Sequence, residues 1–335
     1  MATSSIGTKI IGVRNCTTSE ITALGLSLSE PFGPGIGSRG LRIDEEEKAL
    51  YSMGYDPKLW EYPEKRALIE ACYTHVESGI PPILNLYFPR QRLKDCILEG
   101  LHSVVVVGHL MDTTSSREEP LYENMYCATE FVPVLILNDD QNGVYLKAEL
   151  TEVSPDTKDY RTAVRIRVGD DDIEGFCAAL LIPFPPRVRL PGSHATRLAV
   201  YWLNQLQTEF RLFAKPLVVR TFLLSSNTLK ETVTRQCPNP QECSIYRSLT
   251  FPRYVWVSEY GYLEDWKNSD CAALVKRGEL IFDATLPPTM NAEFLVIHIP
   301  GEIILKRIVE DRIKIEHHEL AGDGPSPLLR PRTRP

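Results

Sequence analysis

Three apolar runs in the first half of the chain constrain its fold more than any other feature. They are the segments Glu77–Phe88, Leu101–Gly108 and Val132–Tyr145. Each consists mainly of branched and aromatic residues and is bounded by glycine, proline, asparagine or aspartate, a composition typical of buried β-strands that end in turns. The sequence therefore predicts a sheet core around which the rest of the chain is arranged.

Residues suited to acid–base chemistry lie at the ends of two of these runs. His102 opens the second run, and the third run ends in Asn138, Asp139 and Asp140. A strand that begins with the histidine and a later strand that finishes with the acids and the amide would place an imidazole against an orienting group. Such a pair is two thirds of a nucleophilic triad.

The candidate nucleophile is Cys16, near the start of the chain. Thr17, Thr18 or Ser19 can cap a helix that runs to about Leu28, with apolar residues along one face. Cys16 then lies at or just before the N-terminus of that helix. The positive end of the helix dipole and a neighbouring imidazolium both favour the thiolate over the thiol, which suits this cysteine to nucleophilic attack.

The order of these features resembles the papain-like cysteine peptidases, in particular the compact bacterial branches that include the bacteriocin-leader peptidases and their uncharacterised relatives. Those families carry SG-x-P before an apolar strand, then H-[AS]-V-V-V-x-G, and later N-D-D/P-x-x-G-x-Y. This sequence supplies Ser78, Gly79 and Pro81, then His102 to Gly108, then Asn138, Asp139, Gly143 and Tyr145. The resemblance covers residues 8–150, a little under half of the chain.

The resemblance implies a Cys–His–Asp triad. By position in the pattern, Cys16 is similar to the family's nucleophile, His102 to its base and Asp139 to its orienting residue. Asn138 is the reserve for the orienting role, but neighbouring strand residues point to opposite faces, so both cannot reach His102. The resemblance also implies cleavage of peptide or isopeptide bonds through an acyl-enzyme, with no cofactor.

One part of the family pattern is replaced in this chain. Papain-like peptidases usually carry a glutamine shortly before the cysteine, whose amide helps to stabilise the oxyanion, but residues Lys9 to Asn15 contain none. Asn15, or Arg14, together with the Cys16 backbone N–H, is the candidate substitute. The replacement also fits a second hypothesis, a catalytically lapsed papain-like module that binds proteins as a subunit of a larger assembly.

His109 is the rival base. Seven residues separate it from His102 along the same predicted strand, so we expect it near the opposite end of that strand, facing the other way. The alternative for His102 is a purely structural role at the start of a strand, and the alternative for Cys16 is a small buried residue under its helix.

The whole chain is predicted to be α+β, with a papain-like core in which an N-terminal helix carries the cysteine and an antiparallel sheet carries the histidine and the acid. That core is placed at residues 8–150, a strand-rich region at 151–320 and a proline-rich disordered tail at 321–335. Helices are expected at 44–53, 63–76 and 193–213. In the last third, Arg220, Ser225, Asn227, Glu259 and Asp283 are candidates to face a pocket, although strand ends often carry such residues for solubility.

Composition limits the class of protein. The chain has 335 residues, enough for one large core or two modest ones, with the apolar and charged fractions of an ordinary globular protein. A net charge of -7 without a lysine or arginine stripe argues against nucleic-acid binding. No signal-peptide pattern opens the chain and no apolar run approaches the roughly 20 residues of a membrane span. We therefore expect a cytoplasmic protein that acts on a protein or peptide.

Metal and phosphate sites are not expected from the motifs. The eight cysteines include no C-x-x-C pair, and the loop that holds Cys237 and Cys243 fits no common zinc spacing. Reduced thiols packed as small apolar groups are the better hypothesis. The glycine-rich segment 31–40 lacks the spacing of a phosphate-binding loop, and Asp170, Asp171 and Asp172 lack that of a calcium-binding loop.

Overall fold

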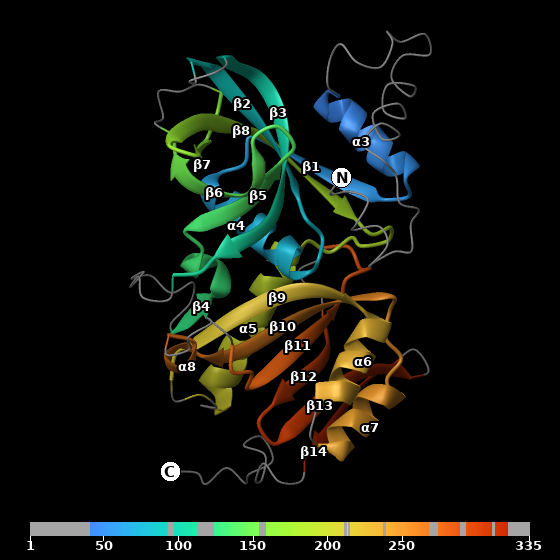
Figure 1. Ribbon diagram of the computed structural model, residues 1–335. Coiled ribbons are helices and arrows are strands. Elements are labelled where there is room, and N and C mark those ends of the chain that lie inside the picture. The colour runs from blue at the N-terminus through green and yellow to red at the C-terminus, as the bar shows by residue number, and fades with distance from the viewer. Residues whose placement is uncertain are drawn as a thin grey trace. The chain divides into compact units, whose positions relative to one another are not determined.

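The computed structural model (Figure 1) describes residues 41–92, 97–112, 124–153, 159–210, 213, 215–236, 239–267, 274–288, 293–309 and 312–320. The chain divides into two compact units: one contains residues 1–112 and 132–187, the other 113–131 and 188–335. Both combine helices with strands, which confirms the predicted α+β class. Cys16, Asn15 and the helix expected to carry them lie outside the described residues, as does the tail at 321–335.

The first unit is built on an antiparallel sheet that closes into a barrel. The sheet order is β1-β8-β2-β3-β5-β6-β7, and an additional pairing of β7 with β8 closes a ring of six strands, with β1 outside it. The strands are β1 (Asp56–Glu61), β2 (Ile83–Arg92), β3 (Ile97–Leu110), β5 (Val134–Asp139), β6 (Gly143–Glu152), β7 (Thr162–Val168) and β8 (Asp171–Phe184). The three apolar runs of the sequence become β2, β3 and β5, next to one another in the ring.

Alternation along the strands fills the barrel. In β2, β3 and β5, every second side chain is almost fully buried: Leu84, Leu86, Phe88, Val104, Val106, Leu135 and Leu137. Because successive strand residues point to opposite faces, His102 shares the face of Val104 and Val106, one step before the buried stretch begins. The histidine therefore lies at the end of the barrel core, where the interior meets solvent.

Two helices of the described residues accompany this barrel. Helix α3 (Ile43–Ser52) packs Leu50 and the adjoining Met53 and Tyr55 against Ile83 and Leu181 on the outside of the strands. Helix α4 (Lys65–Glu77) contacts β3 and β6, and it ends where Gly79 adopts a left-handed conformation with φ of 69°. The glycine of the SG-x-P stretch thus has a structural role as the stop signal of α4.

The second unit is a seven-stranded sheet in the order β14-β13-β12-β11-β10-β9-β4. Its strands are β4 (Met125–Cys127), β9 (Leu217–Ser225), β10 (Tyr254–Tyr262), β11 (Gly278–Asp283), β12 (Phe294–Ile299), β13 (Glu302–Val309) and β14 (Arg312–Glu319). All pairs are antiparallel except β4 with β9, which run parallel, and the strands confirm the strand-rich region expected here.

Helices cover both faces of this sheet. Helix α5 (Gly192–Phe210) lies on one face, and α6 (Ser226–Gln236) and α7 (Pro240–Ser248) lie side by side on the other (Figure 1). Leu229 and Val233 of α6 and Tyr246 of α7 pack with Val255 and Val257 of β10 in one buried cluster. The one-turn helix η1 (Ala128–Phe131) and α8 (Leu263–Lys267) complete the unit.

The structure corrects two expectations and confirms others. The first unit includes β7 and β8, because these strands close the barrel, so the unit boundary lies after residue 187 rather than at 150. The segment around Cys243 is not a loop but helix α7, which Pro240 opens and the Asn239 side chain caps by accepting a hydrogen bond from the Gln241 backbone N–H at 3.0 Å. Helices α3, α4 and α5 confirm the predicted helices.

The described cysteines Cys72, Cys127, Cys177 and Cys243 are free thiols, and the first three are buried, as expected for small apolar groups.

None of the helices that the structure describes combines the length and the hydrophobicity that a membrane crossing requires.

Candidate active site

The candidate site forms where two neighbouring strands of the barrel meet a tight hairpin. Strands β3 and β5 are antiparallel, and Val105 of β3 pairs with Asn138 of β5. His102 lies three residues before Val105, so it is level with the turn that follows β5. That turn is short because Asp139 already pairs with Gly143 at the start of β6.

His102 and Asp139 are joined by a hydrogen bond. Nε2 of His102 donates to Oδ1 of Asp139 at 2.9 Å, and the two side chains are 13% and 2% exposed. A second carboxylate, that of Asp140, has an oxygen 4.0 Å from the same nitrogen but is largely exposed. From the sequence we predicted that these two residues, 37 positions apart, lie close together, and in the structure they are in contact.

The hairpin itself fixes the Asp139 carboxylate. Its Oδ1 accepts hydrogen bonds from the backbone N–H groups of Gln141 at 2.8 Å and Asn142 at 3.1 Å, and its Oδ2 accepts one from the Asn142 side chain at 2.8 Å. Gly143 ends the turn with a φ of 122°, a conformation that glycine adopts readily because it has no Cβ. The carboxylate is thus oriented before it meets the imidazole.

These contacts shift both protonation equilibria toward an ion pair. Burial raises the pKa of Asp139, but the hydrogen bonds from His102, Asn142 and Gln141 outweigh it and hold that pKa at about 2. The hydrogen bond to Asp139 raises the pKa of His102 above its ordinary value of 6.5, against the opposing effect of burial. The imidazolium is therefore stabilised at this position.

The other ring nitrogen of His102 remains available for proton transfer. Within the described part of the chain, Nδ1 has no hydrogen-bond partner. With Nε2 held by the acid, a neutral ring carries its proton there and presents Nδ1 as the acceptor. Cys16 and Asn15, the proposed nucleophile and oxyanion donor, lie outside the described residues.

Asn138 and His109 have other partners. The Asn138 side-chain oxygen accepts a hydrogen bond from the Tyr145 backbone N–H at 3.0 Å, which stabilises the hairpin, so Asp139 rather than Asn138 contacts His102. His109 lies toward the other end of β3, where Nε2 is 3.0 Å from the Glu77 carboxylate and the ring lies 4.7 Å from that of Tyr73.

A polar cluster beside His102 was missed from the sequence. The Ser103 hydroxyl lies 2.6 Å from Oε1 of Glu46 in α3 and 2.7 Å from Oδ1 of Asn85 in β2. Burial raises the pKa of Glu46, while hydrogen bonds from Ser103 and Asn85 and the charge of His102 lower it in part. The only signal in the sequence is an asparagine inside the apolar run of β2. From that residue alone, the contact with Glu46 on a distant helix could not be predicted.

One set of residues near the hairpin has the spacing of metal ligands. Atoms of His102, Asp139 and Asp140 lie within 4.8 Å of one another. However, both Asp139 oxygens already accept hydrogen bonds from the turn or from His102, so a cation would have to displace these contacts. Because both Asp139 oxygens are already engaged, the arrangement fits an imidazole–carboxylate pair better than a metal centre.

No family model matches the chain, and comparison with curated proteins and with solved structures gave no match either. The function is therefore inferred from the geometry of the site itself.

Proposed function

We propose that this protein is a papain-like cysteine hydrolase that cleaves peptide or isopeptide bonds with Cys16, His102 and Asp139. The observation that carries the proposal is the hydrogen bond of 2.9 Å from His102 to Asp139, which engages Nε2 and leaves Nδ1 for a nucleophile. This is the division of roles that a nucleophilic triad requires of its histidine. The order of the three residues along the chain supports the same assignment.

The chemistry follows from these roles. Nδ1 of His102 takes the proton of the Cys16 thiol, and the thiolate adds to the substrate carbonyl to form a carbon–sulfur bond. The imidazolium then gives its proton to the departing amine, which leaves a thioester. A water molecule, deprotonated by the same imidazole, hydrolyses the thioester and regenerates the thiol. Asp139 fixes the ring and stabilises the imidazolium at each stage.

Covalent labelling with an epoxysuccinyl peptide probe tests the proposal. Because the chain has eight cysteines, the modified residue is located by mass spectrometry. We expect selective labelling at Cys16 and a fall in its rate of at least about a hundredfold in His102→Ala, the usual scale of general-base catalysis. His109→Ala is the matched control, since it removes a histidine from the same strand, and it should label at the wild-type rate.

Two results would overturn the assignment. Labelling at Cys16 that is equally fast in wild type and His102→Ala would mean that the imidazole does not activate this thiol. Uniformly slow labelling of all cysteines in a correctly folded wild-type protein would favour the alternative of a lapsed, protein-binding module. Repeating the measurement with a chelator distinguishes a triad from a metal centre, because only the latter would respond.

A further inference from the structure

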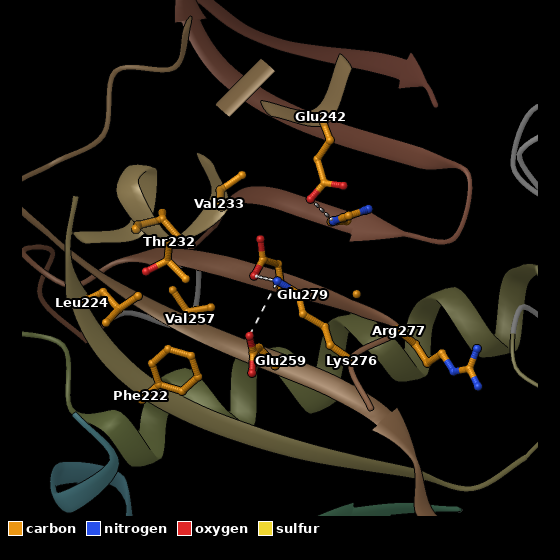
Figure 2. Close-up of a pocket in the computed structure, with 13 residues that line it drawn as sticks. Phe222, Leu224, Thr232, Val233, Glu242, Val257, Glu259, Lys276, Arg277 and Glu279 are labelled. Atoms are coloured by element: carbon orange, nitrogen blue, oxygen red, sulfur yellow. Dashed lines mark hydrogen bonds and ion pairs between the residues drawn. The ribbon is translucent and has the colours of Figure 1, made fainter. Parts of the chain in front are cut away.

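The second unit contains a cavity between one face of its sheet and helices α6 and α7 (Figure 2). Its volume is about 370 Å³, within the range of roughly 300–1,000 Å³ that is usual for small-molecule sites. Strands β9, β10, β11 and β12 and both helices contribute side chains. All of the lining belongs to a single compact unit.

The cavity has an apolar and a charged side. Figure 2 shows Phe222, Leu224, Val257 and Val233 grouped on one side, and Glu242, Glu259, Lys276 and Glu279 on the other. The apolar residues come mainly from β9 and α6, and the charged ones mainly from α7, β10 and the start of β11. A ligand that fills such a space needs an apolar body and a charged end.

Most of the charges in the cavity neutralise one another. Glu279 is 1% exposed; Tyr246 donates a hydrogen bond to it, and Nζ of Lys276 donates another at 2.6 Å. Lys276 also lies 3.6 Å from Glu259, which accepts a hydrogen bond from Arg220 at 2.7 Å. Burying charges costs free energy unless they are paired, and these groups are paired.

Among the described residues, Glu242 forms no ion pair with a lysine or arginine, although the charge of Lys276 interacts with it from a greater distance. The Glu242 side chain is 14% exposed, and its contact is Nδ1 of His298 at 3.6 Å, longer than a hydrogen bond. Arg277 does not pair with Glu242, because its guanidinium binds Asp265 at 2.9 Å and extends away from the other lining residues in Figure 2. In the described part of this unit, three carboxylates of the cavity therefore share two fixed cations, Lys276 and Arg220.

We propose that this cavity binds a small organic cation, in which a primary ammonium group is attached to an apolar aliphatic or aromatic body. The ammonium hydrogen-bonds the Glu242 carboxylate and supplies the missing positive charge. The apolar body packs against Phe222, Leu224 and Val257. The site is independent of the Cys16–His102–Asp139 hydrolase, since it lies in the other unit and none of its lining residues belongs to that triad.

Calorimetric titration of the full chain with 2-phenylethylammonium tests the charge requirement. We expect saturable binding to one site, with binding of the neutral isostere 2-phenylethanol and of the anion 3-phenylpropanoate at least about tenfold weaker, a difference of about 1.4 kcal/mol. Hexylammonium should bind as well, because the apolar side of the cavity does not demand an aromatic ring.

Two variants locate the site. Glu242→Gln keeps the size of the side chain and should weaken 2-phenylethylammonium binding at least about tenfold. Thr232→Trp, on the α6 side of the cavity, should block it by filling the space. Glu264→Gln is the control, because Glu264 is exposed, pairs with Lys215 and lies outside the cavity lining, so binding should be unchanged.

The proposal is overturned by any of three results in folded protein. The first is equal or tighter binding of the neutral or anionic probe. The second is unchanged ammonium binding in both Glu242→Gln and Thr232→Trp. The third is no binding of either ammonium probe at about 10 mM, a concentration at which even a weak site with a dissociation constant near 1 mM would be saturated.

Discussion

The His102–Asp139 pair in the first unit and the Glu279–Lys276 pair in the second both join an acid to a base. The first pair can exchange a proton, whereas the second holds two fixed charges. The first pair includes an imidazole, whose pKa the Asp139 hydrogen bond raises above its ordinary value of 6.5 and whose second nitrogen is available within the described part of the chain. In the second, burial opposes both charges, yet Lys276 lowers the pKa of Glu279, and Glu279, Glu259 and, to a smaller extent, Glu242 raise that of Lys276.

The difference teaches that paired charges alone do not mark a catalytic site. Glu279 and Lys276 stay ionised across the neutral range, so they supply fixed charges for binding and cannot easily exchange protons. The imidazole of His102 can take up and release a proton while Asp139, whose pKa is about 2, remains ionised. We therefore propose proton transfer for the first unit and ligand recognition for the second, and the following experiments test that contrast.

The largest expected effect is that of Asp139→Ala on labelling of Cys16. Without the carboxylate, His102 loses both its fixed tautomer and the stabilisation of its charged form, so we expect a fall in rate of about a hundredfold. Asp139→Asn should lose less, because an amide oxygen can still accept the Nε2 hydrogen bond. Equal rates in wild type and Asp139→Ala would show that the hydrogen bond has no part in activating the thiol.

Lys276→Met should cost the second unit about 2 kcal/mol in the free energy of unfolding, because it leaves Glu279 buried without its cation. We expect less than the roughly 3–5 kcal/mol of a fully buried pair, since the Lys276 side chain is 36% exposed. Denaturant unfolding followed by tryptophan fluorescence measures it, because Trp202, Trp256 and Trp266 belong to this unit. Lys215→Met, which breaks an exposed pair, is the control.

Acidification should remove the stabilisation that Asp139 provides, about 2 kcal/mol. The folded-state pKa of about 2 lies below the ordinary value of 3.8, so the contribution is complete above about pH 4 and is lost as the pH falls toward 2. Because the pKa of His102 is raised above 6.5, the stabilisation that the charged imidazole contributes declines as the pH rises through that raised value.

Urea unfolding at a series of pH values, followed by far-ultraviolet circular dichroism, measures this dependence. The stability difference between wild type and Asp139→Asn should be widest between about pH 4 and 6.5 and should close at lower pH. Glu64→Gln is the control, because Glu64 forms an exposed ion pair with Arg161 in the same unit. A difference that stays constant down to pH 2 would contradict the ion pair.

The smallest expected effect is that of Asn138→Ala. The variant removes a hydrogen bond within the hairpin, worth about 1 kcal/mol of stability, but leaves the contact between His102 and Asp139 in place. Labelling of Cys16 should therefore stay within about threefold of wild type, the kinetic equivalent of less than 1 kcal/mol. A larger loss than that of Asp139→Ala would reverse the assignment of the orienting residue.

The sequence by itself determined the elements and one pair of the site. Runs of branched residues predicted β2, β3 and β5, and apolar periodicity predicted α3, α4 and α5, because local patterns reflect which face of an element is buried. The alternation of strand residues showed that Asn138 and Asp139 could not both reach His102, and the family resemblance favoured Asp139, which is the residue in contact.

Only the tertiary structure decided how distant segments combine. The pairing of β7 with β8 closes the barrel, and the short strand β4 joins the sheet of the second unit, from which it is separated in sequence by β5 to β8. Glu259 was a candidate to face a pocket, but its neighbours Glu242, Lys276 and His298 come from three other segments. Contacts across such separations depend on register and packing of the whole sheet, which no local pattern of residues encodes.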